Sequence, residues 1–283
     1  MLLEEASAAG ETVRREGRRI KTLYIGGGTP TTLEAGQLAR LLEGLRQAFD
    51  LSACREFTVE AGRPDTITRE KLEVLASAGV SRVSVNPQTM EDAVLKAIGR
   101  RHTAGEILTA YQLVRQAGIP VVNMDLIAGL PQDSPEGFRR SLDAVLKLGP
   151  ENITVHTLAL KKGARLLEEG SGLPEGPAVA QMLDYAWQTL ARAGYRPYYL
   201  YRQKFMSGSF ENVGWSLPGY ESLYNICMME ELHTVLSLGA GGVTKLVEPE
   251  TGRIVRRSNP KFPQEYIRDR ARICLEKEQI LTF

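Results

Sequence analysis

Polar residues and glycines that could hold a small ligand follow five successive apolar segments of the sequence. An ionised carboxylate at the end of an otherwise apolar segment must be paired or bound, because an isolated charge is costly to bury. Adjacent glycines expose backbone N–H and C=O groups and allow close approach to a ligand. The residues concerned are Gly26-Gly27-Gly28-Thr29-Pro30, Glu60, Asn86-Pro87-Gln88, Asp125 with Gly129, and the stretch from His156 to Lys161.

The glycine turn by itself leaves two interpretations open. It lacks the G-K-[ST] of a nucleoside-triphosphate loop and the G-x-G-x-x-G of a dinucleotide turn. One interpretation is a ligand platform, and the other is a tight strand-to-helix turn capped by Thr29 or Thr31.

The cysteines do not predict a metal site. Cys54, Cys227 and Cys274 are far apart and match no ligand spacing such as C-x-x-C. An odd number of distant cysteines is typical of reduced thiols, so we expect a cytoplasmic protein.

The elements that must position these residues alternate between short β-branched runs and amphipathic helices. Such alternation over about 140 residues predicts an α/β fold with a parallel sheet, whose ligands bind at the carboxyl ends of the strands. A helix over 2–16 precedes the first strand. The predicted strands are 20–27, 55–62, 80–88, 120–131 and 152–160.

The regular alternation of strand and helix patterns ends beyond residue 163. One more helix is predicted at 176–195, followed by a mixed α+β extension in which the stretch from Asn212 to Asn225 has the composition of a packed loop. We therefore expect two regions, 1–163 as a partial barrel and 164–283 as the last barrel helix with a substrate-associated extension.

Composition and charge exclude two classes of function. The 283 residues carry a net charge of +1, without the basic excess of a nucleic-acid-binding protein. We also expect no membrane span, because a span needs roughly 20 consecutive apolar residues.

Six motifs in order resemble the radical S-adenosylmethionine (radical SAM) enzymes of the oxygen-independent coproporphyrinogen III oxidase family. Within it, the stretch YYLYRQKFMSGSFENVGWSLPGYESLYNI is most similar to the Gram-positive-type coproporphyrinogen dehydrogenase branch. The resemblance implies a radical-SAM (β/α)6 partial barrel. The motifs are YIGGGTPTTL, FTVEAGRPDTIT, RVSVNPQTM, IGRRHTAGEI, NMDLIAGLPQDSPEGF and ITVHTLAL.

The resemblance also implies roles for individual residues. Backbone groups of Gly27, Gly28 and Thr29 would hold the methionine ammonium of S-adenosylmethionine, and Glu60 would contact the same molecule. Four further residues match positions that line the pocket of a second S-adenosylmethionine: Gln88, Arg100, Asp125 and Ala159.

One expected motif is missing. The family holds a [4Fe–4S] cluster through C-x-x-x-C-x-x-C after its first strand, and neither that motif nor that strand is found in this sequence. We therefore expect a truncated barrel without metal ligands, and a chain that is inactive alone.

The resemblance implies oxidative decarboxylation of coproporphyrinogen III to protoporphyrinogen IX by the intact protein, in haem biosynthesis, with an electron donor for the cluster. Propionate side chains of a tetrapyrrole need cationic partners, for which Arg196, Arg202 and Lys204 are candidates; a solvated basic loop is the alternative. A cluster-free paralogue that binds S-adenosylmethionine or haem, like a haem chaperone, is the alternative function. A phosphate-binding barrel of another family is a third.

Overall fold

The computed structural model describes residues 1–159, 173–202, 210–248 and 250–281. The chain forms two compact units, each built from separate stretches of sequence. The barrel unit contains Ile25–Glu34 and Thr58–Ser222. The terminal unit contains Met1–Tyr24, Ala35–Phe57 and the chain from Leu223 onward.

A seven-stranded sheet has the order β1-β2-β3-β4-β5-β7-β6 and forms a mostly parallel half-barrel. β2, β3, β4 and β5 pair in parallel, whereas β7 pairs antiparallel with both β5 and β6. The strands are β1 (Thr22–Ile25), β2 (Glu56–Glu60), β3 (Arg82–Ser84), β4 (Val121–Ala128), β5 (Asn152–Thr157), β6 (Arg196–Tyr201) and β7 (Asn212–Ser216).

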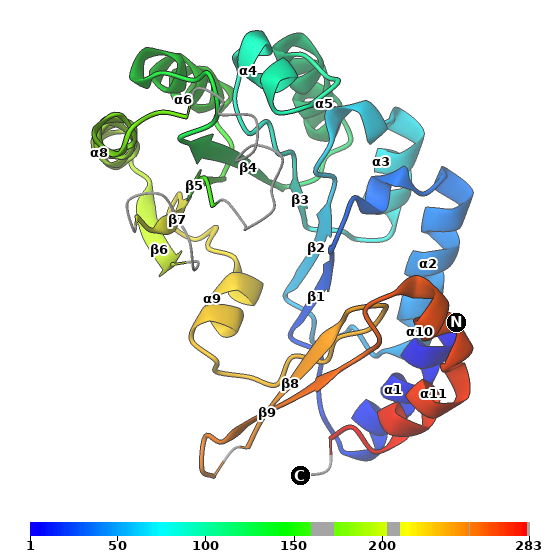
Figure 1. Ribbon diagram of the computed structural model, residues 1–283. Coiled ribbons are helices and arrows are strands. Elements are labelled where there is room, and N and C mark those ends of the chain that lie inside the picture. The colour runs from blue at the N-terminus through cyan, green and yellow to red at the C-terminus, as the bar shows by residue number, and fades with distance from the viewer. Residues whose placement is uncertain (160–172, 203–209, 249, 282–283) are drawn as a thin grey trace. The chain divides into compact units, whose positions relative to one another are not determined.

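Helices of the barrel unit connect these strands and lie outside the curve of β2 to β5 (Figure 1). Their ends follow local sequence signals. Ser134 caps α6 by accepting a hydrogen bond from the Gly137 amide, and Gly149 ends the same helix in the left-handed conformation. The helices are α3 (Arg69–Ser77), α4 (Asp92–Ala97), α5 (Ala104–Gln116), α6 (Pro135–Leu148) and α8 (Gly176–Arg192), with 3-10 turns at Pro30–Thr32 and Pro64–Thr66.

The two faces of the sheet in the barrel unit differ in chemistry. Along β4, Val122, Met124 and Leu126 are fully buried, whereas Asn123 and Asp125 point to the opposite face and are partly exposed. The strand register extends this second face, here called the inner face, across four strands. Its residues on β2 to β5 include Thr58, Glu60, Arg82, Ser84, Asn123, Asp125, Asn152, Thr154 and His156.

The inner face continues onto β7 and β6. Gly214 on β7 lies opposite both Thr154 and Tyr199. A Cβ atom at Gly214 would lie only 1.8 Å from the Tyr199 ring, so glycine is required there for the ring to cross the strand.

The sequence prediction of a loop from Asn212 to Asn225 is wrong. This stretch contains β7 and the first turn of the helix α9 (Leu223–Met229). β7 is held by antiparallel pairing on both sides, which is a tertiary contact that local composition does not reveal.

The terminal unit packs helix α1 against α2 and α11 and adds a two-stranded sheet. A Cβ atom at Gly10 would lie 2.0 Å from the Ala48 carbonyl oxygen, so glycine allows close approach of α1 to the end of α2. The further elements are α1 (Leu2–Arg15), α2 (Ala35–Ala48), β8 (Val243–Val247), β9 (Ile254–Ser258), α10 (Pro263–Arg268) and α11 (Arg270–Glu278).

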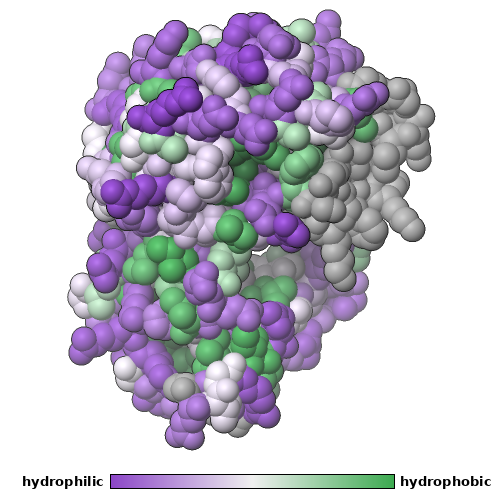
Figure 2. All heavy atoms as spheres, turned by 90° about the vertical axis from the view of Figure 1, so that its left-hand side faces the viewer, coloured by the Kyte–Doolittle hydropathy of each residue, from purple (hydrophilic) through white to green (hydrophobic). Residues whose placement is uncertain are grey.

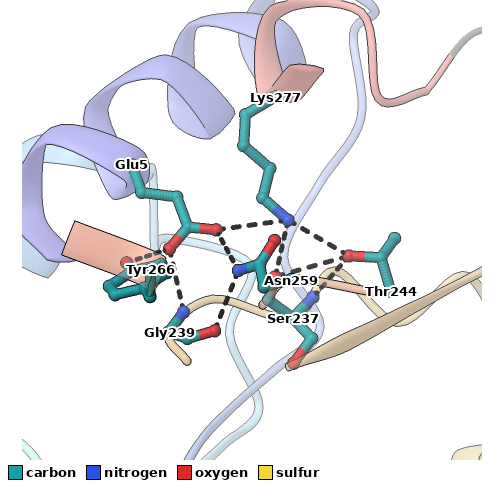
Figure 3. Close-up of polar contacts among 7 residues, drawn as sticks. All are labelled: Glu5, Ser237, Gly239, Thr244, Asn259, Tyr266 and Lys277. Carbon is teal, nitrogen blue, oxygen red and sulfur yellow. Dashed lines mark hydrogen bonds and ion pairs between the residues drawn. The ribbon is translucent and has the colours of Figure 1, made fainter. Parts of the chain in front are cut away.

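A buried carboxylate on α1 holds this unit together (Figure 3). Glu5 is 0% exposed and accepts hydrogen bonds from the Asn259 side chain at 2.7 Å, the Gly239 amide at 2.8 Å and the Tyr266 hydroxyl. Its Oε1 lies 3.3 Å from Nζ of Lys277, which is also buried. The carboxylate therefore links the first helix to four later segments of the chain.

The predicted α/β partial barrel is confirmed, and each of the five predicted strands is present. The expected helix at 2–16 corresponds to α1. The predicted boundary near residue 163 lies outside the described residues and stays a prediction.

No helix in the described part of the chain is long and apolar enough to cross a membrane. The face seen in Figure 2 is mainly hydrophilic, with hydrophobic residues in small groups.

We expect Glu5→Ala to lower the free energy of unfolding of the terminal unit by about 3 kcal/mol, because Lys277 and its neighbours would lose their buried partner. Urea denaturation followed by circular dichroism measures the change. Glu4→Ala is the matched control: that carboxylate is 47% exposed, and its ion pair with Arg270 contributes less than about 1 kcal/mol. Equal effects of the two substitutions would contradict the assignment.

Candidate functional site

The candidate site lies on the inner face and at the carboxyl ends of its strands. Because β2 to β5 are parallel, these ends lie along one edge of the sheet. Glu60 ends β2, and the segment containing Gln88 follows β3. Ala159 follows β5 by two residues and is partly buried. Ligands of open parallel sheets bind at such edges.

Asp125 is the centre of a polar network on β4 and β5. Its Oδ1 accepts a hydrogen bond from the Asn123 side-chain amide at 2.7 Å, and Oδ1 of Asn123 accepts one from the Thr154 hydroxyl at 3.1 Å. Its Oδ2 lies 3.6 Å from Nε2 of His156. Nδ1 of His156 lies 3.5 Å from the Tyr201 hydroxyl on β6.

These contacts keep Asp125 charged. Burial alone would raise the pKa of its carboxyl, but His156 and the hydrogen bonds from Asn123 and Thr154 outweigh burial and lower the pKa. The Asp125 and His156 side chains remain 18% and 26% exposed, so a ligand can reach the pair from the inner face. The site therefore presents a fixed negative charge.

Gln88 is joined to the same strand. Its backbone N–H donates to the Asp125 carbonyl at 2.9 Å, and its carbonyl accepts from the Ile127 amide at 2.9 Å. Its φ is 68°, which is unusual for a residue other than glycine and reverses the chain beside β4. The structure thus brings together two of the predicted site residues, Gln88 and Asp125.

The glycine turn is exposed. Gly27 has a φ of +83°, which favours glycine for conformational reasons. A Cβ atom at Gly28 would meet nothing within 4 Å, so packing does not require glycine there. Thr29 accepts hydrogen bonds at its carbonyl from the Thr32 amide and hydroxyl, and its side chain does not cap the following 3-10 turn. The turn therefore leaves an open backbone surface.

Arg100 lies in the loop before α5 and is half buried. Burial and the neighbouring charge of Arg63 lower the pKa of its guanidinium, and Asp65 opposes them. In the same loop His102 is 3% exposed, and its ring nitrogens have no hydrogen-bond partner within the described residues. Burial is also the main cause that lowers the pKa of His102.

Further polar atoms of the inner face are unsatisfied. Ser84 Oγ and Asn86 Oδ1 are buried and have no hydrogen-bond partner among the described residues. Buried oxygens of this kind usually have a hydrogen-bond partner, which a bound molecule or water would supply here. Unpaired acceptors, a fixed carboxylate and an open glycine turn fit the donors and charge of S-adenosylmethionine.

Sequence reasoning missed several members of this network. The sequence identifies His156 only as a strand-end residue and predicts no role for Asn123, Thr154, Tyr199 or Tyr201. A signal was present, because Asn123, Asp125 and Thr154, His156 are polar at alternate positions of two neighbouring strands. The contribution of β6 had no comparable signal.

The predicted substrate residues lie at or beyond β6. Arg196 is exposed at the start of β6. Arg202 pairs with Glu211 at 2.9 Å, which offsets its charge. Lys204 lies outside the described residues.

The residues present do not fit an iron–sulfur cluster. All three cysteines are described and none forms a disulfide. Burial is the largest cause that raises the pKa of Cys54, Cys227 and Cys274, whereas cluster ligands must be thiolates. No group of three or more potential metal ligands occurs within the described residues.

Comparison with solved structures supports the fold. Coproporphyrinogen III oxidase (HemN) from Escherichia coli, described as a radical SAM enzyme, matches with a TM-score of 0.73 and 21% identity. The match covers 97% of this chain and 66% of that one. The similarity shows a shared fold.

Curated relatives include an oxygen-independent coproporphyrinogen-III oxidase-like protein, HemZ, from Bacillus subtilis. It is 45% identical over 268 residues, which cover 93% of this chain and 53% of the relative. The heme chaperone HemW from Lactococcus lactis is 33% identical over 229 residues, which cover 79% of this chain and 57% of the relative. The chain thus spans little more than half the length of these two relatives.

A family model described as the radical SAM superfamily matches residues 1–145, slightly more than half of the chain. This match and the two relatives confirm the resemblance found in the sequence motifs. The chain therefore belongs to the radical SAM superfamily.

Proposed function

We propose that the barrel unit binds S-adenosylmethionine on its inner face and forms part of a protein that acts on a tetrapyrrole. The observation that carries this proposal is the ionised Asp125, held by Asn123 and His156 and joined through the backbone to Gln88.

The chemistry of the ligand agrees with the residues around this carboxylate. S-adenosylmethionine carries an ammonium, a sulfonium, a carboxylate and ribose hydroxyls. Asp125 and Glu60 suit the cationic and hydroxyl groups, and the planar guanidinium of Arg100 suits a carboxylate. Backbone groups of Gly27, Gly28 and Thr29 would hold the ammonium of one molecule. Gln88, Arg100, Asp125 and Ala159 would line the pocket of a second S-adenosylmethionine.

When bound beside a reduced [4Fe–4S] cluster, S-adenosylmethionine supplies hydrogen-abstracting chemistry in this superfamily. The residues of this chain would position S-adenosylmethionine and complement its charges, and they leave one edge of the sheet open to it. Ligands for a cluster would have to come from residues outside these 283. We therefore propose that this polypeptide alone binds S-adenosylmethionine but does not carry out the radical reaction.

For the whole protein we propose oxidative decarboxylation of coproporphyrinogen III in haem biosynthesis, with an external electron donor. The similarity to HemZ supports this choice. Arg196 is our main candidate for a propionate partner, since Arg202 is already paired with Glu211; Lys204 remains a candidate from sequence. A cytoplasmic location is supported by three cysteines that form no disulfide.

A second candidate is haem binding without radical chemistry. The similarity to HemW, a heme chaperone, favours it, as does the poor fit of these cysteines to a cluster. Titration with haem and with coproporphyrin, followed by absorbance, separates the two: tight binding of haem alone supports the second candidate.

We expect Asp125→Asn to weaken S-adenosylmethionine binding by roughly 10- to 100-fold, because the substitution removes a partly buried charge that faces a cationic ligand. Isothermal titration calorimetry of the purified chain measures the change. Glu136→Gln is the matched control, since that carboxylate lies exposed on α6. Failure of the unsubstituted chain to bind S-adenosylmethionine would overturn the proposed function.

We expect Arg196→Ala to weaken coproporphyrin binding by about tenfold, the effect of losing one charge-assisted hydrogen bond to a propionate. Arg202→Ala should have a smaller effect, because Glu211 already offsets its charge. Quenching of porphyrin fluorescence gives the dissociation constants, with Arg192→Ala at the end of α8 as control. Unchanged affinity in Arg196→Ala would remove this residue from the substrate site.

A further inference from the structure

Three side chains from three different strands form a continuous line on the inner face. Asp125 lies on β4, His156 on β5 and Tyr201 on β6. The Asp125 Oδ2 to His156 Nε2 distance is 3.6 Å, and the His156 Nδ1 to Tyr201 hydroxyl distance is 3.5 Å. The line therefore connects the ligand-binding carboxylate to a strand that is far away in sequence.

The donor and acceptor roles along this line are mutually consistent. If the Tyr201 hydroxyl donates to Nδ1 of His156, the imidazole proton resides on Nε2 and faces the Asp125 carboxylate. The other carboxylate oxygen is already held by the Asn123 amide at 2.7 Å. Both oxygens of Asp125 then face a donor of the protein, Oδ1 at hydrogen-bond distance and Oδ2 at 3.6 Å.

This arrangement leaves Asp125 able to bind a further group. An ionised carboxylate has about four lone-pair sites, so its three neighbouring donors, Asn123, Thr154 and His156, leave at least one site for a ligand. The remaining sites belong to a side chain that is 18% exposed. Donors on both oxygens fix the plane of the carboxylate before a ligand arrives, and such preorganisation increases affinity.

We propose that His156 is a positioning residue that orients the Asp125 carboxylate for its ligand, and that Tyr201 selects the imidazole tautomer needed for this. The inference rests on the proposed binding of S-adenosylmethionine. It adds two residues, from β5 and β6, that act on the ligand through Asp125.

A double-mutant cycle tests the inference. We expect His156→Phe to weaken S-adenosylmethionine binding about tenfold, the effect of losing one polar contact to a charged group. His156→Gln keeps an amide donor and should stay within about threefold of the unsubstituted chain. In the Asp125→Asn background, His156→Phe should add less than about twofold, since the two residues act as one unit. Calorimetric titration of the unsubstituted chain, the three single variants and the double variant gives these values, with thermal unfolding as a check on folding.

The tautomer has its own measurement. The chain contains only three histidines, so ¹⁵N-histidine labelling gives few signals, and His156→Gln identifies the relevant one. We expect an Nε2–H imidazole in the unsubstituted chain and a mixture of tautomers in Tyr201→Phe. Tyr185→Phe is the matched control, because that hydroxyl donates to Asp143 between two helices.

The outcomes separate the inference from the proposed function. If the unsubstituted chain does not bind S-adenosylmethionine, the proposed function fails and the inference fails with it. If that chain binds but His156→Phe binds equally well, or if the two substitutions are additive, the inference alone is overturned. An Nδ1–H imidazole in the unsubstituted chain would overturn the role of Tyr201.

Discussion

The alternation of side chains along the parallel strands is the constraint on which the barrel unit depends. Each strand turns successive residues to opposite faces, so β4 buries Val122 and Met124 beneath helices and presents Asn123 and Asp125 on the other side. A shift of register by one residue would exchange the two sets. The apolar face stabilises the sheet, and the inner face becomes available for chemistry because it does not contribute to that core.

The hydrogen-bonding groups on a polar face inside a curved sheet must find partners either within the protein or on a ligand. Asp125, Asn123 and Thr154 satisfy one another, whereas Ser84 Oγ and Asn86 Oδ1 have no partner in the described part of the chain. The face is therefore organised in one region and incomplete in another. This division is typical of a preformed site in which some protein groups are fixed in advance and others bind the ligand.

The residues of the proposed pocket and the cysteines belong to different units of the chain. The residues that match a ligand pocket lie within the barrel unit, whereas the three cysteines all belong to the terminal unit and have a raised pKa. Thiols of this kind are suited to packing rather than to cluster ligation. The terminal unit is instead organised around Glu5, whose partners lie in the loop before β8, directly after β9, in α10 and in α11 (Figure 3).

The sequence by itself determined the parallel strands and the helix ends, because these depend on local periodicity and capping residues. Strand-end polarity predicted Gln88 and Asp125 as site residues. It also revealed the superfamily through the order of six short motifs. Only the tertiary structure showed that His156 and Tyr201 join Asp125, and that Asn212–Ser216 is a strand between β5 and β6. The reason is that antiparallel pairing of β7 brings β6 beside the inner face, and such long-range pairing has no signature within any single segment of the chain.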